Sequence, residues 1–249
     1  MSRRVVEHAS MIYRTKLKKK EEVAEGTTAF YFEKPAGFMY KPGQHIDIKL
    51  LNPRETDAEG NSRIFSLVSA PYEEDITVTT RMRPTAFKRV FGAMPLGTEV
   101  EFEGPFGSMV LHNDSMKPAV FLAGGIGITP FMSMVREAIY EKLPHKIYLF
   151  YSNRRPEDTA FLKKLQETQK RNPNFVLIAT MTDAEKSAKP WNGERGYIDG
   201  AMLKKFVSDL TKPIYYLAGP PLMVQAMREM IVKAGADEDN IKSEEFAGY

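Results

Sequence analysis

The chain has 249 residues, which is enough for two domains of ordinary size. Hydrophobic residues make up 43% and charged residues 27%, the balance of a soluble globular protein. The formal net charge is only +3, so a nucleic-acid partner is not expected. The chain has no cysteine, which excludes disulfides and cysteine-ligated zinc or iron–sulfur centres within it, and its four histidines lack metal-ligand spacing.

The sequence shows no sign of targeting to a membrane or to a secretory route. Its first residues lack the apolar stretch of a signal peptide. No segment approaches the ~20 consecutive apolar residues of a membrane-spanning helix. We therefore expect a cytoplasmic protein with no membrane span.

The first half of the chain reads as short strands separated by Gly, Pro, Asn or Asp turns. A short helix is expected at Thr85–Gly92, and the polar segment Asn52–Ser62 is expected to be an exposed loop. Six strands at this spacing predict a small antiparallel barrel. The expected strands are Met11–Lys18, Thr27–Glu33, His45–Leu50, Arg63–Ser69, Ile76–Thr80 and Glu99–Gly104.

In the second half strands and helices alternate, which predicts a parallel sheet with helices on both faces. The boundary is placed in the polar stretch Asn113–Lys117, giving domains at 1–114 and 115–249. Thr129 is expected to cap the first helix, with Pro130 as its first residue. The expected strands are Ala119–Ala123, Ile147–Tyr151, Phe175–Thr180, Ile214–Ala218 and Ile241–Phe246. The expected helices are Pro130–Lys142, Asp158–Lys170, Ala201–Ser208 and Leu222–Ala234.

A glycine-rich turn, Gly-Gly-Ile-Gly-Ile-Thr-Pro at 124–130, lies between a buried strand and a helix. Glycines let the backbone approach a phosphate, and the helix N-terminus supplies N–H donors and the positive end of a dipole. The third glycine of the full dinucleotide fingerprint is missing. On these residues alone, a phosphate site and a tight turn without a ligand are equally good interpretations.

Three further segments bear on ligand binding. Ala-Gly-Pro-Pro at 218–221 also closes a strand, and ligands of open α/β sheets bind at that edge. Ser152, Arg154 and Arg155 follow another strand, where arginine could clamp a phosphate or simply be solvated. In the first half, Arg63 and Phe65 share one side of a strand. They could serve a flat phosphorylated ligand, or be a surface arginine beside a core phenylalanine.

Together these segments resemble the ferredoxin–NADP reductase superfamily, in order and over nearly the whole chain. That family has an FAD-binding barrel followed by a nicotinamide-binding α/β domain. The matching segments are Pro42-Gly43-Gln44 before the third strand, Arg63-Ile64-Phe65-Ser66 for the flavin motif Arg-x-Tyr-Ser/Thr, Gly104-Pro105-Phe106-Gly107 at the barrel end, 124–130 for Gly-Gly-x-Gly-x-Thr-Pro, Ala218-Gly219-Pro220-Pro221 for Cys-Gly-Pro-Pro, and Glu245-Phe246 at the end of the last strand.

The resemblance implies a set of FAD contacts. Arg63 would bind the pyrophosphate, Phe65 would lie against the isoalloxazine ring, and Ser66 would contact the flavin near N5. The helix around 85–88 would turn its N-terminus toward the pyrophosphate. The other residues implied around FAD are Ile64, Thr79, Thr80, Arg81, Thr85, Ala86, Phe87 and Lys88, with 79–81 on the ribityl and adenosine side.

The resemblance also implies a nicotinamide site. Either Phe246 or Tyr249 would cover the isoalloxazine, and we favour Phe246 because Tyr249 is the last residue. The residues implied at the reacting centre are Ser66, Thr129, Glu245 and Phe246. The residues implied around NADP or NAD are Gly125, Gly127, Thr129, Pro130, Ser152, Arg154, Arg155, Gly219, Pro220 and Met223, with 152–155 at the adenosine end.

The sequence departs from the family pattern at three places. Phe65 replaces the usual tyrosine, so stacking can survive but the phenol hydrogen bond to the flavin cannot. The run Thr-Ala-Phe-Lys at 85–88 replaces a glycine- and serine-rich run, and Lys88 adds charge at the pyrophosphate. Ala218 replaces a cysteine that is frequent beside the nicotinamide ring in the family, so slower or differently aligned hydride transfer is expected.

The function implied is that of an FAD-dependent NAD(P)H oxidoreductase with no fused iron–sulfur module. Hydride transfer from nicotinamide to flavin requires alignment of the rings more than an acid or base. The electrons would pass to a separate acceptor such as a ferredoxin, a flavodoxin, a cytochrome or an oxygenase component; free flavin, a quinone or a metal chelate is also possible. NADPH is favoured over NADH because Ser152, Arg154 and Arg155 could hold a 2′-phosphate and no acidic residue just after that strand would bind the ribose diol.

Two alternatives of another class stay open. A non-catalytic flavin-bearing electron-transfer or regulatory subunit would keep the fold while a partner does the chemistry, and Ala218 and Phe65 leave room for that. Such a chain should bind FAD, but NAD(P)H should not reduce it. A scaffold without a cofactor conflicts with the number of glycine turns and predicts a colourless protein.

Overall fold

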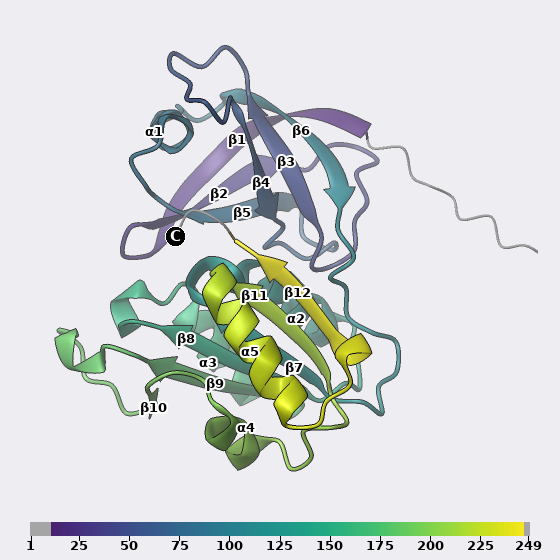
Figure 1. Ribbon diagram of the computed structural model, residues 1–249. Helices are drawn as coiled ribbons and strands as arrows, with labels where there is room; N and C mark the ends of the chain where they lie inside the picture. Colours follow the sequence, from purple (N-terminus) through teal and green to yellow (C-terminus); the bar gives the residue numbers. More distant parts are fainter. Residues whose placement is uncertain (1–10, 247–249) are drawn as a thin grey trace, which may run out of the picture.

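The computed structural model describes residues 11–246, and it contains two six-stranded sheets. Figure 1 shows the first sheet above the second, with β12 running toward the barrel. The strands are β1 (Met11–Ala24), β2 (Thr27–Glu33), β3 (His45–Leu50), β4 (Ser62–Ser66), β5 (Asp75–Arg81), β6 (Glu99–Phe106), β7 (Ala119–Gly124), β8 (Ile147–Asn153), β9 (Phe175–Met181), β10 (Glu194–Arg195), β11 (Ile214–Gly219) and β12 (Ile241–Glu245). The helices are α1 (Ala86–Ala93), α2 (Ile128–Tyr140), α3 (Leu162–Arg171), α4 (Gly200–Phe206) and α5 (Pro221–Lys233).

The first sheet is an antiparallel barrel with the strand order β4-β3-β6-β1-β2-β5. It closes because Leu67, just after β4, pairs with Val78 of β5, and the Val68 amide donates to the Thr77 carbonyl at 2.8 Å. In β3 the apolar residues alternate with polar ones, so one face of the strand enters the core. Helix α1 covers the barrel end with Phe87 and Phe91, both buried.

The second sheet is parallel, with the order β10-β9-β8-β7-β11-β12. All six residues of β7 are buried because helices cover both faces of the sheet. Helices α2 and α3 pack on one face, in a cluster with Phe121 of β7, while α4 and α5 pack on the other with Leu122. The expected fold class, an antiparallel barrel followed by a parallel α/β unit, is confirmed.

The start of α2 differs from the sequence prediction. Gly125–Gly127 forms a 3-10 turn, and α2 already begins at Ile128, with Gly127 in the cap position. Thr129 is therefore not the cap. Its hydroxyl donates to the Ile126 carbonyl at 3.0 Å, which braces the glycine turn from within the helix. The prediction was wrong because glycine backbone can tighten into a 3-10 turn, which side-chain pattern does not reveal.

Helix α3 also starts later than predicted. The segment Pro156–Asp158 forms a separate 3-10 turn, and Phe161 takes a left-handed conformation with φ 62° before α3 begins at Leu162. Phe161 keeps this conformation because its ring is buried, only 4% exposed, in the core under α2 and α3. Asp158 thus belongs to the turn before α3, where it is free to bind neighbouring groups.

The described part of the chain offers neither a membrane-spanning helix nor a cluster of metal ligands. None of the helices in residues 11–246 has both the length and the apolar character needed to cross a membrane. Within the same residues, no three acidic or histidine side chains gather in a way that could hold a metal ion.

Candidate functional site: two adjoining cavities

The first cavity, here called the barrel cavity, has a volume of about 330 Å³. It lies between β4, β5 and the N-terminus of α1. The parallel α/β unit closes its other side with Ile126 of the glycine turn, Thr129 and Phe246 after β12. Its lining consists of Glu59, Arg63, Ile64, Phe65, Ser66, Thr79, Thr80, Arg81, Arg83, Thr85, Lys88, Ile126, Thr129 and Phe246.

Four cationic side chains gather around the barrel cavity. Arg63 is held by Asp57 and Glu59, each at 2.9 Å, whereas Arg83 and Lys88 form no ion pair within residues 11–246. Burial lowers the pKa of Lys88, and the charges of Arg83, Arg63 and Arg81 lower it further. Cations held together without enough counter-charge favour a bound polyanion such as a pyrophosphate.

The capped start of α1 adds to this preference. Thr85 has extended backbone and its hydroxyl accepts from the Lys88 amide at 3.3 Å. Both residues line the barrel cavity, so the positive end of the helix dipole faces the same space as the four cations. The helix terminus and the cations therefore act on one ligand.

Two hydroxyl groups in the barrel cavity are buried without a partner. Ser66 is 3% exposed and Thr79 is 4% exposed, and neither side-chain oxygen has a hydrogen-bond partner within the described residues. A buried hydroxyl without a partner is costly, so both are suited to a polar ligand atom. Phe65 supplies an aromatic wall beside them while its ring also stacks on Phe91 at 5.5 Å. Phe65 is thus both a core residue and a lining residue.

The second cavity, here called the sheet-edge cavity, has a volume of about 720 Å³. It opens at the carboxyl ends of β7, β8 and β11. The chain leaves β7 to one side for β8 and returns on the other for β11, so this is the topological switch point where open α/β sheets bind ligands. Its lining consists of Arg81, Arg83, Gly124, Gly125, Ser152, Asn153, Arg154, Thr182, Asp183, Tyr197, Ile198, Pro220, Leu222, Met223, Ala226 and Met227.

Two glycines let the ends of β7 and β11 approach each other. A Cβ atom on Gly127 would lie 2.1 Å from the Ala218 carbonyl oxygen and 2.8 Å from the Gly219 nitrogen. Gly219 has φ 158°, and its own Cβ would lie 3.2 Å from the Gly124 backbone. Gly127 and Gly219 line neither the barrel cavity nor the sheet-edge cavity; they allow the backbone approach that builds the wall between the two.

The two cavities share a wall. Arg81 and Arg83 line both, and the glycine turn contributes Gly125 to the sheet-edge cavity and Ile126 to the barrel cavity. A flat ligand in one space therefore lies next to a ligand in the other. This arrangement suits transfer of a hydride between two stacked rings.

The structure brings together most of the residues predicted for the site. In the barrel cavity these are Arg63, Ile64, Phe65, Ser66, Thr79, Thr80, Arg81, Thr85, Lys88, Thr129 and Phe246, and in the sheet-edge cavity they are Gly125, Ser152, Arg154, Pro220 and Met223.

Several predicted residues do not line either cavity. Ala86 is buried, Phe87 packs in the barrel core, Pro130 is buried in α2, and Glu245 is exposed beside β11. Arg155 follows Arg154 but turns away, because its guanidinium is bound by Asp158 and Glu25. Tyr249 lies outside the described residues.

Sequence reasoning missed some lining residues. Arg83 lies two residues beyond Arg81 on the chain segment after β5, and its charge in an otherwise turn-like stretch was the available signal. Asn153, Asp183 and Tyr197 come from three separate strand ends, and only the sheet order unites them. The Asn153 side-chain amide is buried and has no partner within residues 11–246.

Comparisons by sequence agree with this geometry. Residues 121–229 match the family described as the oxidoreductase NAD-binding domain. The glycine betaine monooxygenase reductase subunit of Chromohalobacter salexigens is 28% identical over 88% of this chain and 60% of its own length. The propane 2-monooxygenase reductase component of Rhodococcus jostii is 25% identical over 85% of this chain and 57% of its own. The chain thus spans less than two thirds of these relatives.

Solved structures share the fold. The Amycolatopsis cytochrome P450 reductase GcoB superposes with a TM-score of 0.82 at 20% identity, covering 96% of this chain and 71% of its own. A ferredoxin NADP+ reductase from Neisseria gonorrhoeae with bound FAD and NADP gives 0.76 at 19% identity, covering 94% and 98%. These structures show the fold of this chain, a barrel joined to a parallel α/β unit, and residues 121–229 match the oxidoreductase NAD-binding domain family.

Proposed function

We propose that this chain is an FAD-dependent reductase that oxidises NADPH or NADH and delivers the electrons to a separate acceptor. The observation that carries the proposal is the pair of adjoining cavities with Arg81 and Arg83 in their shared wall. One cavity has the cations and unpartnered hydroxyls for a flavin dinucleotide. The other lies at the sheet edge where a nicotinamide dinucleotide would bind.

The residues of the barrel cavity fit FAD. Arg63, Lys88 and the N-terminus of α1 would hold the pyrophosphate, and Phe65 would flank the isoalloxazine ring. The Ser66 hydroxyl, which is buried without a partner within the described residues, would donate to a flavin ring nitrogen. When bound, FAD accepts a hydride from the nicotinamide and can release its electrons singly.

The second unit would align the donor. Gly125 and Pro220 would let the nicotinamide half approach the barrel cavity, and Phe246 lines that cavity at the end of β12. The Phe246 amide donates to the Gly219 carbonyl at 3.0 Å, which fixes the aromatic residue to the same turn that shapes the donor site. The protein would thus contribute by aligning the nicotinamide with the flavin ring and by excluding water from them.

The test is a visible spectrum of the purified protein without oxygen, before and after addition of NADPH and then NADH. We expect a flavin spectrum that bleaches. A flavin spectrum that persists with both donors would instead support a non-catalytic electron-transfer subunit. A colourless protein that takes up no added FAD would exclude both the reductase and the electron-transfer subunit.

The FAD affinity should fall as the pH rises. The pKa of Lys88 lies below its ordinary value of 10.5 in the FAD-free protein, because of burial and the three arginines. A bound pyrophosphate favours the charged lysine and raises this pKa, so binding takes up a proton and weakens as the pH rises through the lowered pKa. Lys88→Met should weaken FAD about 10-fold at neutral pH and remove this dependence.

Quenching of flavin fluorescence between about pH 7 and pH 10 measures this effect, on the pH scale of ordinary lysine titration. Lys49→Met, on the exposed side of β3, is the matched control and should keep the wild-type profile. Parallel profiles for wild type and Lys88→Met would show that Lys88 does not face the pyrophosphate.

We also propose NADPH as the preferred donor, with Arg154 as the residue that selects it. Arg154 and Ser152 line the sheet-edge cavity and would bind the 2′-phosphate. Asp183 lines the same cavity, but Lys186 pairs with it at 3.2 Å and weakens its repulsion of a phosphate. Arg154→Ala should raise the dissociation constant of NADPH about 10- to 100-fold and that of NADH much less. Equal losses for both donors would contradict this assignment.

The acceptor is proposed to be a separate protein. The curated relatives are the reductase parts of a glycine betaine monooxygenase and a propane 2-monooxygenase, so an oxygenase component is the first candidate. A ferredoxin or a flavodoxin is the next. Each candidate acceptor is purified and added, without oxygen, to this chain after NADPH has reduced its flavin. Reoxidation of the flavin then shows that the candidate accepts electrons.

A further inference from the structure

The turn between β1 and β2 crosses from the barrel to the second unit. The Glu25 amide donates to the Glu157 carbonyl at 2.9 Å, which joins the turn to the segment 156–158 after β8. Figure 1 shows this turn, in purple, above the teal-green segment that follows β8. The contact lies beside the cofactor cavities rather than inside them.

Arg155 binds acidic groups from both sides of this contact. Its Nη2 lies 3.0 Å from Glu25 Oε2 in the barrel and 3.0 Å from Asp158 Oδ1, and its Nε donates to Asp158 Oδ2 at 3.1 Å. The Asp158 side chain is only 7% exposed. Burial opposes its ionisation, yet the hydrogen bond and charge of Arg155, together with Arg154 and Arg81, lower the pKa of Asp158. A carboxylate held this way fixes the arginine firmly.

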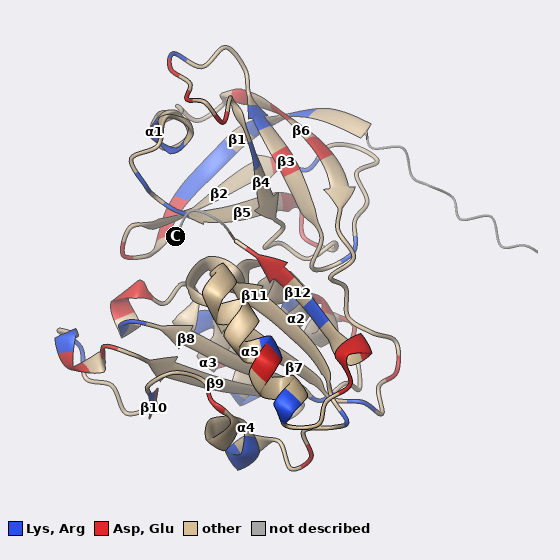
Figure 2. Ribbon diagram, viewed as in Figure 1, with Lys and Arg blue, Asp and Glu red and all other residues tan. Residues whose placement is uncertain are grey.

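The charges make Arg155 necessary at this place. Acidic residues stand on both facing segments, Glu25 on the barrel and Glu157 and Asp158 on the second unit. Figure 2 shows red on both segments. Arg155 binds one carboxylate from each side, Glu25 and Asp158. Without it, like charges would face each other across the contact and push the two units apart.

The contact is connected to the shared wall of the two cavities. The Gly26 carbonyl of the same turn accepts from the Met82 amide at 2.8 Å, and Asp158 accepts through its carbonyl from Arg81 Nη2 at 3.4 Å. Arg81 lines both cavities. A shift of the turn against the segment 156–158 would therefore displace the wall where the two rings must meet.

We propose that Glu25, Arg155 and Asp158 form an interdomain clamp, and that Arg155 is a positioning residue that sets the alignment of the two cavities rather than a ligand of the cofactor phosphate. This inference rests on the proposed function for its kinetic consequence. The clamp itself is a property of the folded chain and can be measured without any cofactor.

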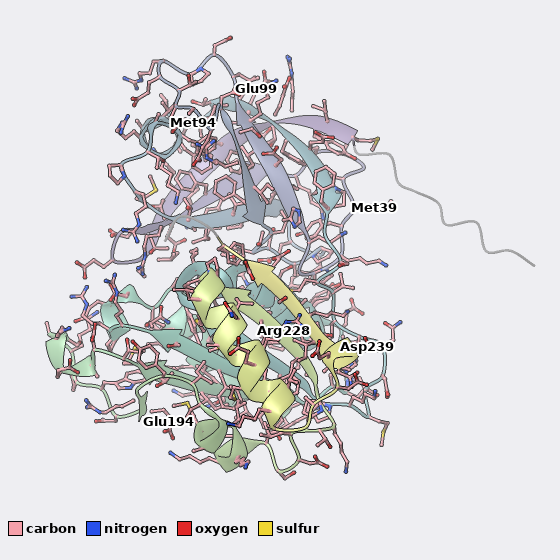
Figure 3. All side chains as sticks on the ribbon, in the orientation of Figure 1. Met39, Met94, Glu99, Glu194, Arg228 and Asp239 are labelled. Carbon is pink, nitrogen blue, oxygen red and sulfur yellow. The ribbon has the colours of Figure 1, made fainter. Side chains whose placement is uncertain are left out.

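The variants are Arg155→Gln, Arg155→Lys and Glu25→Gln. The control matched to Glu25→Gln is Glu194→Gln, which also removes a negative charge, from an ion pair with Lys205 of 3.0 Å. Figure 3 labels Glu194 at the part of the second unit away from the barrel. Each variant is measured by the rate of flavin reduction at saturating NADPH and NADH, and by hydrogen exchange of the Glu25 amide.

Arg155→Gln should slow flavin reduction about 3- to 10-fold with both donors and leave the ratio of NADPH to NADH affinity unchanged. Exchange of the Glu25 amide should become faster, because its partner segment is no longer held. Glu25→Gln should shift both readouts in the same direction but less, since the Arg155–Asp158 bonds survive. Arg155→Lys should restore most of the exchange protection, and Glu194→Gln should change neither readout.

Two results would overturn the clamp. Unchanged exchange of the Glu25 amide in Arg155→Gln would show that the contact does not depend on this arginine. If Arg155→Gln lost affinity for NADPH but not for NADH, and Glu25→Gln changed neither flavin reduction nor amide exchange, Arg155 would be a phosphate ligand. If no donor reduces the flavin of the wild-type protein, the proposed function fails, while the exchange measurement still decides the clamp.

Discussion

Replacing Arg63 by alanine is expected to weaken FAD binding about 100-fold, the largest single loss at the barrel cavity. In the proposed FAD complex the guanidinium would supply charge and a rigid donor fork at the pyrophosphate. It also neutralises Asp57 and Glu59, and its hydrogen bond lowers the pKa of Asp57. Removal of Arg63 therefore leaves two carboxylates near the phosphate in place of one cation.

The measurement is the dissociation constant of FAD, together with the flavin absorbance that survives purification. Arg63→Lys keeps the charge but lacks the fork, so we expect an intermediate loss. Arg14→Ala is the matched control, because Arg14 lies on β1 in a surface pair with Glu101 at 2.9 Å. An Arg63→Ala protein that stays fully yellow after dialysis would contradict the assignment of the pyrophosphate to this end of the cavity.

Gly127→Ala is expected to destabilise the second unit by about 2–3 kcal/mol, through forced displacement of packed backbone. The new Cβ would lie 2.1 Å from the Ala218 carbonyl oxygen, and no flexible side chain is there to move. Gly127 has φ −59°, a conformation open to alanine, so the cost is one of space alone. Reduction of bound flavin by either nicotinamide cofactor should be almost abolished.

Thermal unfolding and the rate of flavin reduction together measure this effect. Gly200→Ala is the control: Gly200 begins α4, its Cβ would meet only Met230 Sδ at 3.9 Å, and alanine there should stabilise the helix by about 0.5–1 kcal/mol. If Gly127→Ala unfolds like the wild type and is reduced at the same rate, the close approach of the turns after β7 and β11 is not needed.

Much of the fold follows from local pattern. Ile46, Ile48 and Leu50 alternate with polar residues, so they can bury one face only as a strand. The six apolar or small residues of β7 require cover on both sides. The helix expected at 85–92 is present as α1, and the structure shows Thr85 as its cap. Each of these features depends on residues only a few positions apart, so the amino-acid sequence alone specifies it.

Helix starts were harder to predict for a physical reason. The beginning of α2 depends on how tightly three glycine-turn residues coil, and glycine backbone carries no side-chain pattern. The beginning of α3 depends on Phe161, whose left-handed backbone is maintained by burial of its ring against other elements. Tertiary packing decided both boundaries.

By itself the sequence determined the order of barrel and α/β unit, the two glycine turns and most residues of the two cavities. Only the tertiary structure decided that Arg154 and Arg155, neighbours in the chain, serve different sites: one lines the sheet-edge cavity and the other binds Glu25 and Asp158. Glu25 and Arg155 are 130 positions apart. Contacts over such distances arise from how the two units dock, and no local pattern of residues encodes that geometry.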